Sequence, residues 1–120
     1  MTPTYPTVEV TSVAGLRGWL AEHHASEPGV VLVTWKKADP QRHVPYDEVV
    51  RQALCFGWID SSARRVDEQR TSIVLTPRRA RSRWSASNRQ RVVELVEAGL
   101  MEPAGLAAIE VAHAAGTWDG

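Results

Sequence analysis

The side chains best suited to recognise a ligand by charge and hydrogen bonding gather in residues 78–89. Arg78 offers a planar guanidinium that matches phosphate or carboxylate. Ser85 and Asn88 lie where a helix is expected to begin, and the first N–H groups of a helix favour negative charge. Trp84 adds one indole face. These residue types predict an anion-binding pocket, although a capped helix beside a solvated basic loop explains them equally well.

Two further groups could complete such a site. Lys36 and Lys37 follow an expected strand, and Asp60 follows Trp58 at the start of another. Asp60 would act either as a general base or, more simply, as the partner of a nearby arginine. In the expected site the lysines and arginine hold a negative group, the serine and asparagine side chains hydrogen-bond to it, and tryptophan forms an apolar wall. Its residues are Lys36, Lys37, Trp58, Asp60, Arg78, Ser82, Trp84, Ser85 and Asn88.

Other chemistries have little support in the residue pattern. His23 and His24 are adjacent, so on a helix they would point about 100° apart, and neither has a partner four residues on for zinc. Cys55 lies near the end of an apolar helix, where burial and the helix dipole disfavour a thiolate. Ser61 lacks the surroundings of a hydrolase nucleophile. We therefore expect no metal, no cofactor and no catalytic residue.

Charge is distributed unevenly along the chain. The formal net charge is zero, which argues against bulk attraction to nucleic acid or a membrane surface. Residues 64–91, however, hold nine arginines and two acids, whereas residues 92–120 hold five acids and no lysine or arginine. Either the acids neutralise the arginines within the fold, or the arginines form an anion-binding face. We do not expect nucleic acid as the partner, and the oligomeric state is left open.

Length and composition describe one ordinary globular domain. A chain of 120 residues fits a single core, so we expect one domain over residues 1–120. The single cysteine excludes an internal disulfide, and the N-terminal residues lack the pattern of a signal peptide. No apolar run approaches the roughly 20 residues needed to cross a bilayer. A cytoplasmic protein without membrane insertion is therefore expected.

Hydrophobic periodicity predicts the elements that position these side chains. Helical spacing is expected from Ser12 to about His24, from Pro45 to Gly57, from Ser85 to Gly99 and from Pro103 to Gly116. In the third helix, Val92, Val93 and Val96 are expected to face inward. A buried strand is expected over residues 30–35, and two antiparallel strands within residues 58–76. The predicted fold is α+β, a mainly antiparallel sheet of about three strands with four helices, in the order α-β-α-β-β-α-α.

Several blocks resemble one bacterial family. Residues 53–61, Ala-Leu-Cys-Phe-Gly-Trp-Ile-Asp-Ser, preceded by Tyr46-Asp47-Glu48, resemble the signature of the YdeI/OmpD-associated proteins, also called bacteriocin-protection proteins. Residues 82–88, Ser-x-Trp-Ser-x-x-Asn, and residues 99–105 are similar to further motifs of that family. The resemblance implies a link to antimicrobial-peptide resistance and stress response, without an established reaction. His23 replaces an asparagine common in the family, and the family's Lys/Arg-rich C-terminal helical segment is expected to be absent.

These observations favour a non-enzymatic cytoplasmic domain that binds a small anionic ligand or partner. Two alternatives remain. The first is an enzyme acting on a small phosphorylated or carboxylated substrate, with Asp60 as acid or base and the arginines stabilising developing charge. The second is an interaction module that docks its arginine-rich face on nucleic acid or on an acidic protein.

Overall fold

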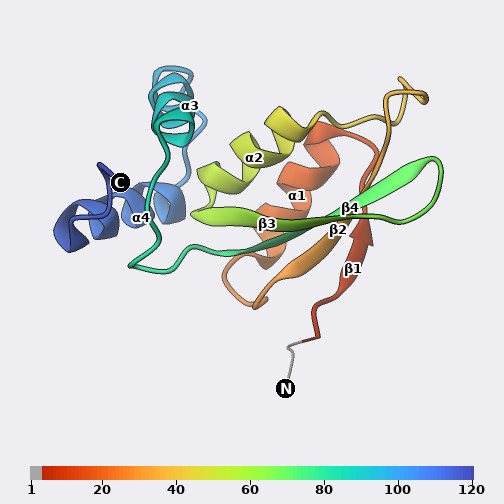
Figure 1. The fold of residues 1–120 in the computed structure, drawn as a ribbon. Coiled ribbons are helices and arrows are strands. Elements are labelled where there is room, and N and C mark those ends of the chain that lie inside the picture. Colours follow the sequence, from red (N-terminus) through yellow and green to blue (C-terminus); the bar gives the residue numbers. More distant parts are fainter. Residues whose placement is uncertain (1–3) are drawn as a thin grey trace.

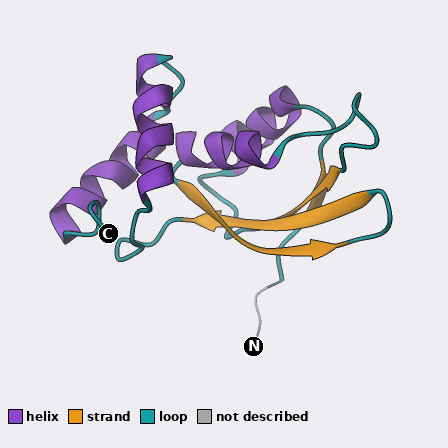
Figure 2. Cartoon of the chain, turned by 45° about the horizontal axis from the view of Figure 1, so that its top comes forward, coloured by secondary structure: helices purple, strands orange, loops and turns teal. Residues whose placement is uncertain are grey.

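The fold is a four-stranded sheet with helices on one side and a two-helix extension at one end (Figures 1 and 2). The computed structural model describes residues 4–120. In chain order the elements are β1 (Thr7–Glu9), α1 (Val13–His23), β2 (Val30–Trp35), α2 (Tyr46–Cys55), β3 (Trp58–Arg65), β4 (Arg70–Pro77), α3 (Ala86–Glu97) and α4 (Pro103–Ala115). Helices α1 and α2 lie over the sheet, whereas α3 and α4 pack beyond it against α2.

The α+β class is correct, but the predicted number and order of elements are wrong. The sheet has four strands in the order β1-β2-β4-β3, and the first described element is a strand. Strand β1 has three residues and pairs parallel to β2, so the sheet is mixed. The N–H of Val31 donates to the Pro6 carbonyl at 2.8 Å, and that of Val10 donates to the Val33 carbonyl at 3.1 Å. A strand of three residues is too short to show an alternating hydrophobic pattern in the sequence. Pairing with the edge of β2, and not local propensity, makes these residues a strand.

The core lies between α1, α2 and the covered face of the sheet. Val30 and Leu32 of β2 point into it and meet Leu16 and Leu20 of α1, all four being fully buried. Alternation along β2 directs these residues to one face, and the two antiparallel pairings β2–β4 and β4–β3 extend that face. The buried strand predicted over residues 30–35 is therefore confirmed as β2.

Most predicted helix ends agree with the structure. The Ser12 hydroxyl oxygen accepts a hydrogen bond from the N–H of Gly15 at 2.9 Å and caps α1, and Ser85 caps α3 in the same way. Gly116, with φ 73°, ends α4 in the left-handed conformation. Pro45 is the cap of α2 and not its first helical residue.

The inner face of α3 differs from the prediction. Val92 and Leu95 are buried, whereas Val93 and Val96 are 47% and 51% exposed. Helix α3 contacts the rest of the fold mainly through α2, so only one narrow side of it is covered. Leu106 of α4 is likewise exposed, because α4 contacts the rest of the fold mainly through α2.

The sheet has two ends with different surroundings. At its hairpin end, Trp35 pairs with Arg70 and Arg65 pairs with Thr71, next to the turn between β3 and β4. At its opposite end, Trp58 pairs with Pro77. No helix within residues 4–120 is long and apolar enough to span a bilayer.

Candidate functional site

A pocket of about 320 Å³ lies at the hairpin end of the sheet, and we call it the strand-end pocket. Residues of β2, β3 and β4 line it, together with residues of the loop between β2 and α2 and with Tyr46, the first residue of α2. Its wall is predominantly apolar, as in most small-molecule sites. The lining residues are Thr34, Trp35, Lys36, Lys37, His43, Val44, Tyr46, Ala63, Thr71 and Ile73.

Two cationic side chains converge beside this pocket. The Lys36 ammonium and the Arg65 Nε both donate to the carbonyl oxygen of Asp67, at 3.4 Å and 3.2 Å. Neither forms an ion pair with a carboxylate in the part of the chain that the structure describes. The Asp67 carboxylate is engaged elsewhere, because Arg70 donates to it at 2.8 Å. Two positive charges thus share one neutral acceptor, and Lys37 is exposed next to them.

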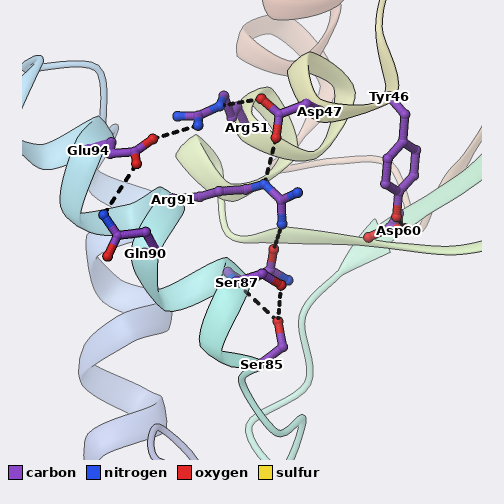
Figure 3. Close-up of polar contacts among 10 residues, drawn as sticks. Tyr46, Asp47, Arg51, Asp60, Ser85, Ser87, Gln90, Arg91 and Glu94 are labelled. Atoms are coloured by element: carbon purple, nitrogen blue, oxygen red, sulfur yellow. Dashed lines mark hydrogen bonds and ion pairs between the residues drawn. The ribbon is translucent and has the colours of Figure 1, made fainter.

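Two further polar groups are held in fixed orientations at the pocket. The Nδ1 of His43 lies 2.8 Å from the Trp35 carbonyl oxygen. A carbonyl only accepts, so Nδ1 carries a proton, and in the neutral form of the ring Nε2 keeps a lone pair. Tyr46, the first residue of α2, donates its hydroxyl to Asp60 Oδ2 at 2.5 Å (Figure 3).

The Tyr46–Asp60 hydrogen bond determines the state of the phenol. Donation to Asp60 is the largest cause that raises the pKa of Tyr46 above its ordinary value of 10.0, and burial acts in the same direction. The phenol therefore stays protonated at neutral pH. Asp60 holds and orients Tyr46, and Asp60 itself is not part of the pocket lining.

The predicted site residues separate into two groups. Lys36 and Lys37 lie at the strand-end pocket, whereas Arg78 and Trp84 lie at the opposite end of the sheet. The six residues of β2 that span this length, at about 3.3 Å each, imply a separation of roughly 20 Å. One small ligand cannot contact both groups.

Arg78 and Trp84 form a packed pair at that opposite end. The Arg78 guanidinium carbon lies 3.8 Å from the centre of the Trp84 ring. The Arg78 Nε and Nη1 atoms are buried without a hydrogen-bond partner among residues 4–120, and burial lowers the pKa of this guanidinium. Trp84 is 3% exposed and Trp58 is 1% exposed. Both indoles fill the core, so neither forms a wall of the pocket or a stacking platform for a base.

Ser82, Ser85 and Asn88 have structural partners. The N–H of Ser82 closes a turn on the Arg79 carbonyl at 3.0 Å. The Ser85 hydroxyl oxygen accepts from the N–H of Asn88 at 3.1 Å, and the Asn88 side-chain oxygen accepts from Arg91 at 2.9 Å. These contacts close the loop before α3 and stabilise the first turns of that helix.

A polar network connects α2 and α3 (Figure 3). Asp47 accepts from Arg51 at 2.6 Å and from Arg91 at 2.9 Å, and Arg51 also pairs with Glu94. The two arginines hold the pKa of Asp47 below its usual 3.8, with Arg51 the larger cause. The ion pairs of this network therefore neutralise the charges of Arg51 and Arg91, whose partners the sequence alone did not show.

Intramolecular pairing and free charge both occur among the nine arginines of residues 64–91. Arg70 pairs with Glu9 and Asp67, and Arg91 pairs with Asp47. Arg89 donates to the carbonyls of Trp84 and Trp118. In the described part of the chain, five form no ion pair and have exposed side chains: Arg64, Arg65, Arg79, Arg81 and Arg83.

Of the residues that line the pocket, sequence reasoning predicted only Lys36 and Lys37. The polar groups that it missed include His43 and Tyr46 in the lining and Arg65 beside the pocket. Arg65 was counted only as part of the basic segment, because its approach to Lys36 depends on the register between strands. His43 gives no such signal in the sequence, because its contact with the Trp35 carbonyl depends on how the loop after β2 folds. Residues 4–120 contain no group of three potential metal ligands. Burial raises the pKa of the Cys55 thiol, as expected.

Comparison with known proteins places the chain in a family. The model of a domain of unknown function, DUF8412, matches residues 8–108. The protein belongs to this family. The match covers β1 from Val8 onward, the other three strands, α1, α2, α3 and the first half of α4. It therefore includes every residue of the strand-end pocket. No curated protein and no solved structure matches the chain.

Proposed function

We propose that this protein binds a small ligand that carries an apolar group next to an anionic group, and that it does so in the strand-end pocket. The convergence of Lys36 and Arg65 on one carbonyl oxygen carries the proposal. A carboxylate or phosphate at this point would replace a neutral acceptor by a charged one, and charge-assisted hydrogen bonds are roughly twice as strong. The apolar group would occupy the space above Ile73 and Ala63.

The remaining polar groups would select among such ligands. In its neutral form His43 offers a lone pair at Nε2, which suits a hydroxyl or amide donor on the ligand. The Tyr46 hydroxyl donates to Asp60 and keeps its own lone pairs for a second donor. This role for Asp60 is one of orientation, so the proposal is of binding and not of catalysis.

A matched pair of probes tests the proposal by calorimetry. Octanoate offers an apolar chain and a carboxylate, whereas octanamide has nearly the same shape without the charge. We expect octanoate to bind at least about tenfold more tightly, in the range of one charge-assisted hydrogen bond. Equal binding of the two probes, or binding of neither, would contradict the proposal.

Two double variants localise the effect. Lys36→Gln with Arg65→Gln removes the two converging charges, and Arg79→Gln with Arg81→Gln removes two charges from the exposed loop before α3. The net charge changes equally in both. Octanoate binding should fall about tenfold in the first variant and stay within about twofold in the second. Equal losses would indicate a nonspecific electrostatic effect.

The resemblance to the YdeI/OmpD-associated proteins extends the proposal to a protective role against antimicrobial peptides. A bacteriocin-sensitive strain that expresses the protein should survive exposure better than the same strain with the Lys36→Gln, Arg65→Gln variant at equal protein level. Survival that is identical with wild type, variant and empty vector would remove this extension and leave ligand binding to its own test.

A further inference from the structure

Strand β3 is an open edge of the sheet next to the strand-end pocket. In the strand order β1-β2-β4-β3 it pairs with β4 on one side only, and residues 61–65 are all exposed. The outer side of β3 therefore presents backbone N–H and C=O groups to solvent, which is the arrangement that accepts an added strand. Figure 2 shows β3 and β4 extending together beyond the helices.

The pocket adjoins this edge through a small side chain. Ala63 belongs to β3, pairs with Ile73 of β4, and both line the pocket. The preceding residues, Ser61 and Ser62, are also small, and they lie at the register shift between Asp60 and Ala63. No bulky β3 side chain therefore stands between the outer edge and the pocket at these positions.

Basic side chains surround the same edge. Arg64 pairs with Ser72 and Arg65 with Thr71, so alternation directs the two arginines to opposite faces of the sheet. Lys36 and Lys37 lie on the pocket side. None of these four side chains forms an ion pair within residues 4–120. A second copy of β3 would carry the same positive charges and be repelled, whereas an acidic strand would be attracted on both faces.

We propose that the ligand of the strand-end pocket is an extended acidic peptide segment that adds to β3 as a fifth strand and inserts one apolar side chain past Ala63. This inference rests on the proposed function and specifies its ligand class. Main-chain hydrogen bonds to β3 supply affinity, and the pocket supplies side-chain specificity. Because side chains two positions apart share a face, an acidic residue two places from the apolar one meets Lys36 and Arg65, and its neighbour meets Arg64.

The test uses a capped peptide, Thr-Val-Leu-Glu-Glu-Thr, and two kinds of control. The first carries lysine in place of both glutamates. The second kind keeps every side chain but carries N-methyl groups on alternate backbone amides. Two such peptides are prepared, one methylated at the odd-numbered amides and one at the even-numbered amides, so that one of them cannot donate hydrogen bonds to β3. Calorimetry measures binding, and amide hydrogen exchange measures protection of residues 61–65.

We expect the parent peptide to bind. One N-methylated peptide and the lysine peptide should bind at least tenfold more weakly than the parent. Amide hydrogen exchange in residues 61–65 should become slower when the parent peptide is bound. Octanoate should bind without protecting that segment, since it has no backbone to pair. Strand addition is overturned if both N-methylated peptides bind as tightly as the parent peptide. It is also overturned if a protein that binds octanoate binds no peptide. Either result leaves the proposed function intact. Failure of octanoate itself overturns the proposed function.

Discussion

Gly105 of α4 packs directly against the backbone carbonyl of Cys55 at the end of α2. A Cβ atom at position 105 would overlap that carbonyl group, which also accepts a hydrogen bond from the N–H of Glu102 at 3.0 Å. The glycine thus allows α4 to approach the end of α2 at backbone contact. This close approach attaches the C-terminal helices to the domain.

Replacing Gly105 by alanine should therefore destabilise the protein. The added Cβ would meet the end of the Met101 side chain, which can move, and the Cys55 carbonyl group, which is backbone and cannot move aside easily. We therefore expect a loss of about 1–3 kcal/mol in the free energy of unfolding. Gly18→Ala is the matched control, because a Cβ there meets no atom within 4 Å and should stabilise α1 by roughly 0.5–1 kcal/mol. Denaturant unfolding of both variants checks the pair, and equal effects of the same sign would contradict this account.

Asp47 should make stability depend on pH in the acidic range. Its pKa lies below 3.8 in the folded protein because Arg51 and Arg91 donate to it. The unfolded chain therefore binds a proton first as pH falls. The stabilisation is complete above the ordinary pKa and is lost as pH falls through the lowered folded pKa, below 3.8.

The variant Asp47→Asn isolates this effect. At neutral pH it should be less stable than wild type, and its free energy of unfolding should fall less steeply between about pH 5 and 3. Urea titrations at several pH values provide the measurement. Parallel pH profiles for variant and wild type would show that the ion pairs between α2 and α3 do not contribute to stability.

Tyr46 should titrate at higher pH than a free tyrosine. Since its folded pKa is raised above 10.0 by donation to Asp60, the contribution to stability is present below about pH 10 and is lost as pH rises through the folded pKa. Asp60→Asn should move the pKa back toward 10.0. Absorbance of tyrosinate follows the titration, and Tyr46→Phe leaves Tyr5 as the reference. An unchanged titration in Asp60→Asn would exclude this hydrogen bond in solution.

Arg78→Met tests the cost of two buried donors without partners. Methionine keeps an apolar contact with Trp84 but removes the buried donors Nε and Nη1. The loss of the cation–π contact lowers stability, whereas removing two unpaired donors from the interior raises it. The free energy of unfolding should therefore change by no more than about 1 kcal/mol. Trp84→Ala should cost about 3–5 kcal/mol, because that ring is buried. Two results together would instead indicate that Arg78 holds an anion: a large loss in the free energy of unfolding of Arg78→Met, and stabilisation by sulfate of the wild type but not of the variant.

Local sequence signals predicted most elements but not their packing. Capping residues such as Ser12 and Ser85 act within one turn, so the helix starts could be read directly. Strand β1 could not be predicted, since its three residues depend on β2 for every hydrogen bond of the pair. The exposure of Val93 could not be predicted either, because periodicity identifies an apolar stripe without showing what covers it.

The sequence by itself determined the α+β class, the basic character of residues 64–91 and the presence of Lys36 and Lys37 at the end of a strand. Only the tertiary structure decided which charges act together. Strand register brought Arg65 to Lys36, whereas the length of the sheet separated both from Arg78. Packing buried Trp58 and Trp84 in the core. The physical reason is that residue type sets which chemistry is possible, whereas distance and burial, which depend on contacts remote in sequence, decide which groups meet a ligand.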